Sequence, residues 1–223
     1  MIRLITPFIF KLVLTICLLG GCSQFNYLSS SYSTTYNLLT NQFTDPESII
    51  DKNLIQNIPY ASSLISFDNN NQSLIILESV KENTNTWISA DKIKIIESNG
   101  RVERSIGLPN DLYSIQRPNL NFNKIVEEGK FSYVAYYSFR NPTLNNLKVE
   151  VQSIIVGYET VEIMGLKKEL ILIEENLYSP LINWSVKNKF WYEPAADFVW
   201  KSRQYISPRL PFIEIEVTKK PAI

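Results

Sequence analysis

The chain begins with a segment whose charge and hydropathy follow the order typical of a secretory signal peptide. Arg3 and Lys11 supply positive charge, residues 12–20 form an apolar stretch, and two glycines directly precede Cys22. The apolar stretch is well short of the ~20 residues that a membrane-spanning helix needs. An uncleaved transmembrane anchor is therefore disfavoured. The sequence predicts an exported chain whose folded part begins after this segment.

The Leu-Gly-Gly-Cys sequence at 19–22 resembles the signal of bacterial lipoproteins. In that class the cysteine thiol receives a diacylglycerol, cleavage exposes the cysteine as the new N-terminus, and its amine can be acylated too. The alternative, an ordinary signal with a chance cysteine, is disfavoured by the spacing. Two or more acyl chains give durable attachment, at about 0.8 kcal/mol per buried methylene. We predict lipid on Cys22. Ser23 stands where enteric bacteria place an aspartate for inner-membrane retention, which favours the periplasmic face of the outer membrane.

Lipidation removes both cysteines from consideration as structural groups. Cys17 leaves with the signal peptide and Cys22 carries lipid, so the mature chain has no disulfide and must be stabilised by its core. The chain also has no histidine. Without free thiolates or imidazoles, a zinc or copper site is not expected, and the only predicted non-protein group is the covalent lipid.

The same inventory argues against most enzyme classes and against nucleic-acid binding. Without histidine there is no Ser-His-Asp or Cys-His arrangement, and the five glycines after the signal form no phosphate-binding loop. Glu193 and Asp197, beside Trp191, are the remaining candidates for a glycosidase pair. Removing Arg3 and Lys11 from the 22 basic residues leaves 20 against 22 acidic ones, with no basic tract. We predict a non-enzymatic protein that binds no nucleic acid.

The remaining chain predicts one mostly β domain. We assign residues 1–21 to the signal peptide, 22–36 to a Ser/Thr/Asn-rich lipidated tether and 37–223 to a single periplasmic domain. Asp45-Pro46 starts a short predicted helix that ends near residue 56. Asn69-Asn70-Asn71 is a predicted turn. No helical periodicity follows, and residues 108–128 read as irregular.

Short β-branched and aromatic runs separated by turn residues fill the domain. Asn99-Gly100, between the runs 92–98 and 101–106, is a strong hairpin signal because both turn residues need positive φ. Residues 148–155 and 158–164 alternate as two further strands, with Val149, Val151 and Ser153 on one face. The pattern predicts an all-β antiparallel sandwich or partly open barrel behind a short helical N-terminal segment. Residues 212–218 are predicted to form an exposed edge strand.

Six stretches together resemble the group 4 capsule and exopolysaccharide lipoprotein family, known as GfcB or YjbF. They are Ile58-Pro59-Tyr60-Ala61-Ser62, Trp87-Ile88-Ser89-Ala90-Asp91, Asn99-Gly100-Arg101-Val102, Gly107-Leu108-Pro109-Asn110-Asp111-Leu112, Asn188-Lys189-Phe190-Trp191-Tyr192 and Val199-Trp200-Lys201-Ser202-Arg203-Gln204. They occur in the family's order over most of the mature chain. One departure is Ala195-Ala196-Asp197-Phe198, where the family would place a glycine.

The resemblance marks a set of candidate site residues, each of which also has a purely structural explanation. The set is Trp87, Gly100, Arg101, Gly107, Leu108, Trp191, Trp200, Ser202, Arg203 and Gln204. The tryptophans are expected in the core rather than stacked on sugar. Arg101, Arg104 and Arg203 either form cross-strand ion pairs or meet an anionic polysaccharide. Ser202 and Gln204 share one strand face and Arg203 the other, so one face buries polar groups or recognises a ligand.

The resemblance implies a periplasmic, mostly β lipoprotein that works with capsule or exopolysaccharide secretion, and it assigns no biochemical activity. We therefore expect an accessory factor of polysaccharide export. Its predicted partners are the membrane, through the lipid, and the polysaccharide export channel or an outer-membrane barrel protein, reached by strand addition at 212–218. The alternative is direct binding of polysaccharide by exposed Tyr and Trp, with hydrogen bonds from Asn and Gln. A third possibility, lipid carriage, requires an apolar cavity inside the fold.

Overall fold

A computed structural model describes residue 55 and residues 57–68 and 72–221. The predicted signal peptide, Cys22, the predicted tether, most of the predicted helix ending near residue 56 and the predicted turn at 69–71 lie outside these residues. Within them, no helix combines the length and apolarity needed to cross a membrane.

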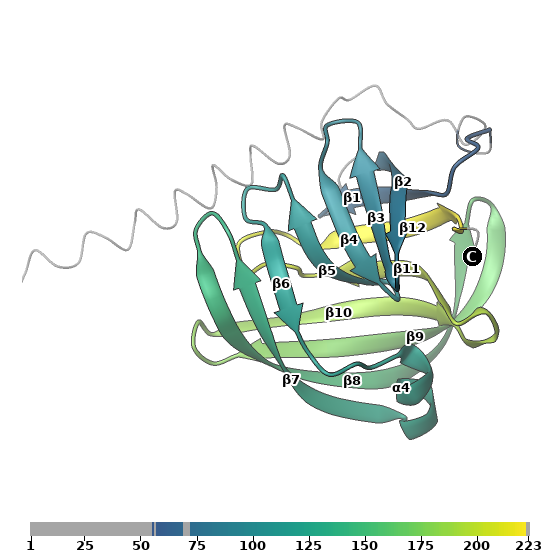
Figure 1. The fold of residues 1–223 in the computed structure, drawn as a ribbon. Coiled ribbons are helices and arrows are strands. Elements are labelled where there is room, and N and C mark those ends of the chain that lie inside the picture. The colour runs from purple at the N-terminus through teal and green to yellow at the C-terminus, as the bar shows by residue number, and fades with distance from the viewer. Residues whose placement is uncertain (1–54, 56, 69–71, 222–223) are drawn as a thin grey trace, which may run out of the picture. The chain divides into compact units, whose positions relative to one another are not determined.

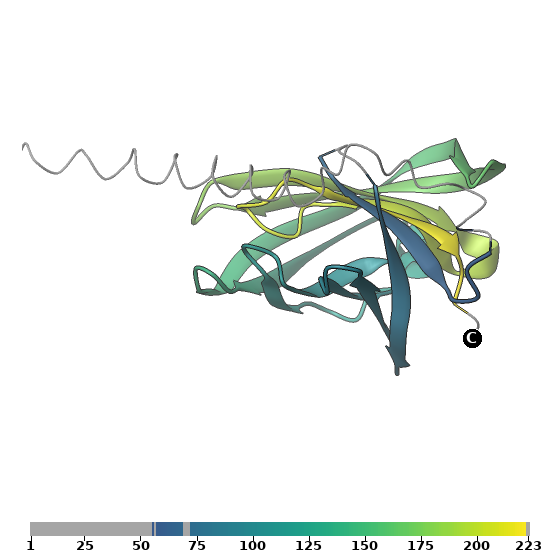
Figure 2. The same ribbon diagram turned by 90° about the horizontal axis from the view of Figure 1, so that it is seen from above.

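The described residues form one antiparallel sheet. Its strands are β1 (Ser62–Phe67), β2 (Ser73–Lys81), β3 (Thr84–Ser89), β4 (Lys94–Ser98), β5 (Arg101–Ile106), β6 (Leu112–Gln116), β7 (Lys130–Phe139), β8 (Leu144–Ile163), β9 (Leu166–Ser179), β10 (Trp184–Glu193), β11 (Phe198–Gln204) and β12 (Ile213–Lys219). Their spatial order is β5-β4-β3-β2-β1-β12-β11-β10-β9-β8-β7-β6. The sheet curls so that β1–β6 face β7–β11 across a shared core (Figures 1 and 2).

The two ends of this order, β5 and β6, are joined by side-chain hydrogen bonds. The Leu112 amide donates to Ser105 Oγ at 2.9 Å, and Ser105 Oγ donates to Asp111 Oδ1 at 3.0 Å. The sheet is thereby nearly closed. The all-β prediction is confirmed, in its form of a partly open barrel rather than a sandwich.

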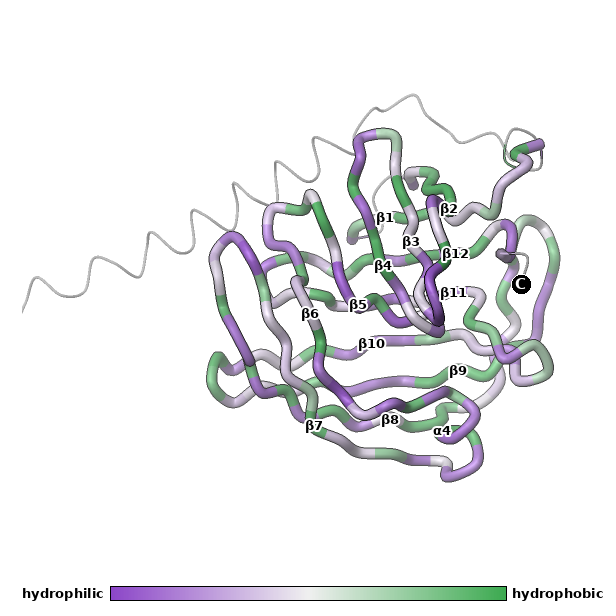
Figure 3. Tube along the Cα trace, in the orientation of Figure 1, coloured by the Kyte–Doolittle hydropathy of each residue, from purple (hydrophilic) through white to green (hydrophobic). Residues whose placement is uncertain are grey.

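Side-chain alternation fills the interior. Val149, Val151 and Ser153 of β8 are all buried on the inner face, as their period of two predicts. Opposite them, Ile65 of β1 and Ile95 of β4 belong to the same hydrophobic cluster. Figure 3 shows hydrophobic and hydrophilic residues alternating along the long strands. The core therefore lies inside the curled sheet and is packed with side chains from both halves.

The Asn99-Gly100 hairpin forms as predicted between β4 and β5. Asn99 has φ 49° and Gly100 has φ 76°, the left-handed values that the sequence requires of this turn. Ser98 pairs with Arg101 directly beside the turn.

Two predictions about local structure are wrong. The segment 108–128 contains β6 and a helix, α4 (Phe122–Glu128), capped by Asn121 Oδ1 on the Lys124 amide and by Gly129 at φ 72°. Two turns of helix are too short to show helical periodicity, although the sequence contains the capping residues Asn121 and Gly129.

The predicted strands 148–155 and 158–164 are one strand, β8, because the irregularity between Ile155 and Gly157 is a bulge that preserves pairing with β9.

The predicted edge strand at 212–218 is also wrong. It corresponds to β12, which is paired on both sides, with β1 and with β11. Pairing between β1 and β12 joins segments about 150 residues apart, which local patterns do not reveal. The ends of the strand order are instead β5 and β6.

Candidate functional site

Several candidate residues meet where the β4–β5 hairpin approaches β11. Gln204 Oε1 accepts from the Val102 amide at 3.0 Å, and its Nε2 donates to the Gly100 carbonyl and to Ser202 Oγ, both at 2.9 Å. A Cβ on Gly100 would lie 2.5 Å from Val199 Cβ. Ser202 and Gln204 are both buried. This hairpin junction, made of Gly100, Val102, Val199, Ser202 and Gln204, fastens one half of the sheet to the other.

Arg101 lies in the interior and is held by a buried carboxylate. Its Nη2 and Nε donate to Glu175 Oε1 at 2.7 and 3.1 Å, and Ser153 Oγ donates to the same oxygen at 3.1 Å. The guanidinium carbon lies 3.6 Å from the centre of the Phe122 ring. Arg101 and Glu175 are 4% and 3% exposed. Arg101 is therefore a cross-strand ion-pair residue, shielded from any external polysaccharide.

The surroundings of this pair are of low polarity. Burial, with the nearby Glu175 charge, raises the pKa of the Tyr133 and Tyr137 phenols, so both stay neutral. A second ion pair joins Arg117 and Glu103. Arg101 and Glu175 are thus a fully buried pair, whereas Arg117 and Glu103 are partly exposed.

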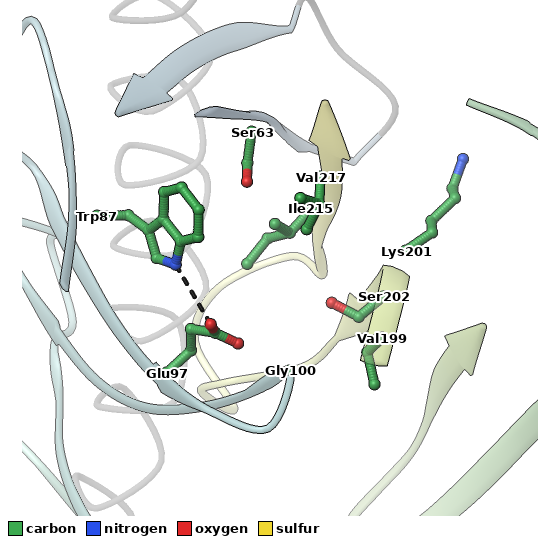
Figure 4. A pocket seen from close by; sticks show the side chains of 9 residues that line it. All are labelled: Ser63, Trp87, Glu97, Gly100, Val199, Lys201, Ser202, Ile215 and Val217. Atoms are coloured by element: carbon green, nitrogen blue, oxygen red, sulfur yellow. Dashed lines mark hydrogen bonds between the residues drawn. The ribbon is translucent and has the colours of Figure 1, made fainter. Parts of the chain in front are cut away.

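A small cavity beside the hairpin junction is lined by Trp87, Glu97, Ser63 and Ser202 among others (Figure 4). Glu97 accepts hydrogen bonds from Asn85 Nδ2 at 2.7 Å and from Trp87 Nε1 at 3.4 Å. Burial raises the pKa of Glu97, and these hydrogen bonds offset only part of that effect. The cavity volume is about 20 Å³, room for about one water molecule. It cannot hold a sugar or the acyl chain that lipid carriage would require.

Gly107 and Leu108 belong to the loop that closes the sheet. Both amides donate to the Asp111 carboxylate, at 3.0 and 2.9 Å. Asn110 Nδ2 donates to the Arg140 carbonyl at 2.7 Å, and Ser207 Oγ donates to Asn110 Oδ1. The loop therefore ties the β5–β6 connection to the β7–β8 turn and to the segment after β11.

The three candidate tryptophans occupy two regions. Trp87 is in the main interior cluster. Trp191 is buried in a separate cluster with Leu170 and Leu172, against which the half-buried Trp200 packs. The Trp191 indole donates to Glu159 Oε2 at 2.8 Å and the Trp200 indole to Glu193 Oε2 at 2.6 Å. Each polar indole nitrogen is satisfied by protein.

Arg203 and Arg104 make contacts within the protein. Arg203 projects from the face of β11 opposite Ser202 and Gln204, and its Nη2 lies 2.9 Å from Glu214 Oε2. Burial alone would raise the pKa of Glu214, but hydrogen bonds from Lys201 and Arg203 outweigh it and lower that pKa. The Arg104 guanidinium lies 5.1 Å from the Tyr113 ring centre.

The glycosidase candidates Glu193 and Asp197 are engaged with separate groups. Glu193 accepts from Trp200 and lies 3.6 Å from Lys168 Nζ. Asp197 Oδ1 accepts from the Tyr192 hydroxyl at 2.7 Å. Asp197 has φ 44°, the left-handed conformation that glycine adopts most readily, so this turn forms without a glycine. Among the described residues, no group of three acidic or other ligating side chains is placed to hold a metal ion.

A larger depression, which the sequence interpretation missed, lies on the outer face of β7, β8 and β9. It has a volume of about 490 Å³ and is lined by Ser132, Tyr133, Val134, Glu150, Val151, Gln152, Asn176 and Tyr178. No motif marks these positions. The available signal was the alternation of β7 and β8, which places Ser132, Val134, Glu150 and Gln152 on the outward face once the strands are aligned.

Comparisons with known proteins agree with the fold. Residues 35–218 match the family described as "Group 4 capsule polysaccharide lipoprotein gfcB, YjbF". The "Uncharacterized lipoprotein GfcB" of Escherichia coli strain K12 is 24% identical over 213 residues, which cover 92% of this chain and 94% of that protein. The crystal structure of the hypothetical lipoprotein YmcC from Escherichia coli K12 has the same fold, with a TM-score of 0.65 and 18% identity over 82% of this chain and 96% of that one.

Proposed function

Because the chain belongs to the group 4 capsule polysaccharide lipoprotein family, we propose that it is a non-enzymatic accessory protein of capsule or exopolysaccharide export. The observation that carries this proposal is the extent of the family match, residues 35–218, which includes every strand from β1 to β11 and nearly all of β12. Because the match covers nearly the whole described domain, it supports a role in polysaccharide export shared with the family, rather than the sharing of one small structural unit.

The placement of the family-like residues supports a non-enzymatic role. Gly100, Ser202 and Gln204 fasten the hairpin junction, and Arg101 is paired in the interior. Gly107 donates to the loop carboxylate that closes the sheet. These groups are used in maintaining the fold, and the cavity beside them is too small for a substrate.

The proposal includes attachment of the domain to the membrane through lipid on Cys22. Acylation of this residue would hold the domain at the periplasmic face of the outer membrane, where Ser23 favours its delivery. There it would act beside the polysaccharide export channel or an outer-membrane barrel protein. Because β12 is paired on both sides, contact with either partner would use an outer face or a loop of the sheet rather than strand addition at 212–218.

A complementation experiment tests the role and the anchor together. In a strain lacking the gene, wild-type protein should restore surface polysaccharide, whereas Cys22→Ala should not, and it should be lost from the outer-membrane fraction. Cys17→Ala is the matched control, since that residue is removed with the signal peptide and its variant should restore polysaccharide fully. Unchanged polysaccharide after deletion of the gene would refute the export role.

The partners are tested by crosslinking in intact envelopes. The tagged lipoprotein should capture the export channel or a neighbouring barrel protein. Recovery of neither, from cells that make surface polysaccharide normally, would contradict direct docking.

A further inference from the structure

The outer face of β7–β9 carries an ordered set of side chains around the 490 Å³ depression. Strand pairing aligns six outward residues in two rows of three, Ser132–Gln152–Asn176 and Val134–Glu150–Tyr178. Directly opposed residues in such rows have Cβ atoms about 5 Å apart, and diagonal neighbours lie about 7–8 Å apart. The volume of the depression falls within the ~300–1,000 Å³ typical of small-ligand sites, and the depression is shallow and open to solvent.

The polar groups of this face are available to a ligand. Gln152 and Asn176 each offer two amide N–H donors and a carbonyl acceptor, and both are half-buried. Within residues 57–68 and 72–221, neither amide side chain nor the Ser132 and Tyr178 hydroxyls form a hydrogen bond with another residue. Groups that stand in a depression with unused donors and acceptors can recognise a ligand that presents hydroxyls.

An aromatic ring stands beside these amides. The Tyr178 side chain is exposed, at 43%, and is diagonal to Gln152 across the β8–β9 pair. The C–H-bearing face of a sugar ring packs on an aromatic face, and its hydroxyls then need partners at the edge. The two rows supply an aromatic face and hydrogen-bonding groups side by side, because the Tyr178 ring lies on one row and the Gln152 and Asn176 amides lie on the next.

The charge of the depression points to an uncharged ligand. Its one ionisable carboxylate, on Glu150, lies 3.0 Å from Lys148 Nζ, which neutralises it. No lysine or arginine lines the depression itself. The two lysines beside it are paired with carboxylates, Lys148 with Glu150 and Lys187, opposite Asn176, with Glu174. A phosphate or uronate would therefore find no unpaired cation there. Val134 is its one exposed aliphatic side chain, which makes the face too polar for a flat hydrophobic protein contact.

We propose that the outer face of β7–β9 binds an uncharged stretch of a polysaccharide chain, with one sugar packed on Tyr178 and its hydroxyls bonded by Gln152 and Asn176. Because the depression is open to solvent, a longer chain can continue past the bound sugars. The source of the glycan, as the exported polysaccharide, rests on the proposed function. The binding chemistry rests on the face itself.

The test uses the purified lipoprotein in a polyoxyethylene detergent, whose headgroup contains no sugar. The probes are cell-surface polysaccharide from the bacterium that encodes the chain, cut to 4–10 sugars, labelled at the reducing end and separated by anion exchange into uncharged and acidic fractions. Fluorescence anisotropy should show binding of the uncharged fraction. Because no ion pair is involved, affinity should change less than about twofold between 50 and 500 mM salt.

Two variants locate the site, and a third is the matched control. Tyr178→Ala should weaken binding about tenfold, equivalent to about 1.4 kcal/mol, and Gln152→Ala severalfold. Tyr158→Ala removes another exposed tyrosine, on the part of β8 beyond the bulge, and should bind like the wild type. The proposal is overturned if uncharged fragments do not bind, if Tyr178→Ala binds as well as the wild type, or if acidic fragments bind more tightly.

Failure of this site can be distinguished from failure of the export role. If deletion of the gene removes surface polysaccharide but no uncharged fragment binds, the site is refuted and the export role stands. If fragments bind through Tyr178 but deletion leaves surface polysaccharide unchanged, the export role is refuted and the binding site stands.

Discussion

Replacing Gly100 with alanine tests whether the hairpin turn meets β11 as closely as the structure has it. The new Cβ would lie 2.5, 2.7 and 2.9 Å from Cβ, Cγ2 and Cγ1 of Val199. An alanine at positive φ costs about 1–2 kcal/mol, and forcing a carbon into a packed core costs about 1–3 kcal/mol more. Gly100→Ala should therefore lower the free energy of unfolding by about 2–5 kcal/mol.

Gly165 provides the matched control, because it also has positive φ, at 84°, but no heavy atom lies within 4 Å of the position of its Cβ. Gly165→Ala should cost only the backbone part, about 1–2 kcal/mol. Urea unfolding followed by tryptophan fluorescence measures both changes. A Val199→Gly background removes all three close atoms, and Gly100→Ala should then cost about as much as Gly165→Ala. Equal costs in the two backgrounds would refute the close approach.

Two further predictions concern buried charge. Arg101→Met leaves the Glu175 carboxyl buried without its partner, so it should destabilise the protein by about 3–5 kcal/mol. Adding Glu175→Leu should recover most of that loss in urea unfolding at pH 7, and no recovery would contradict the pairing. The pKa of Glu97 is raised in the folded chain, so the protonated carboxyl favours the folded state. This stabilisation is complete below the ordinary pKa of 4.5 and is lost as pH rises through the pKa of the folded chain. In urea unfolding at a series of pH values, Glu97→Gln should therefore gain stability relative to the wild type as pH is raised from 4 to 8. If the stabilities of variant and wild type instead change in parallel with pH, this carboxyl is not desolvated.

Features that depend on neighbouring residues could be predicted from the sequence, and features that depend on distant pairing could not. The Asn99-Gly100 turn is set by two adjacent residues, and the inward face of β8 by a period of two. By contrast, the position of β12 depends on its pairing with β1, far away in the chain. The same holds for Arg101, whose partner Glu175 is 74 residues further along.

The outer depression was missed for a related reason. Its residues come from three strands, and the row that joins Ser132, Gln152 and Asn176 exists only in the register of β7, β8 and β9. A shift of one residue in either pairing would turn the side chains that one of these strands contributes from this face into the core. None of the family-like stretches includes a residue of this face.

The separation between the motif residues and the depression follows from the nearly closed sheet. A filled interior has no room for a glycan, so a ligand must bind outside, on positions that alternate with the core. Such positions contribute little to folding, whereas Gly100, Arg101 and Gln204 lie where the two halves of the sheet are joined, so that changing one of them alone is expected to destabilise the fold. Residues recognised as typical of the family are therefore expected to maintain the fold, whereas the proposed glycan-binding residues Tyr178, Gln152 and Asn176 lie on outward positions that the core does not constrain.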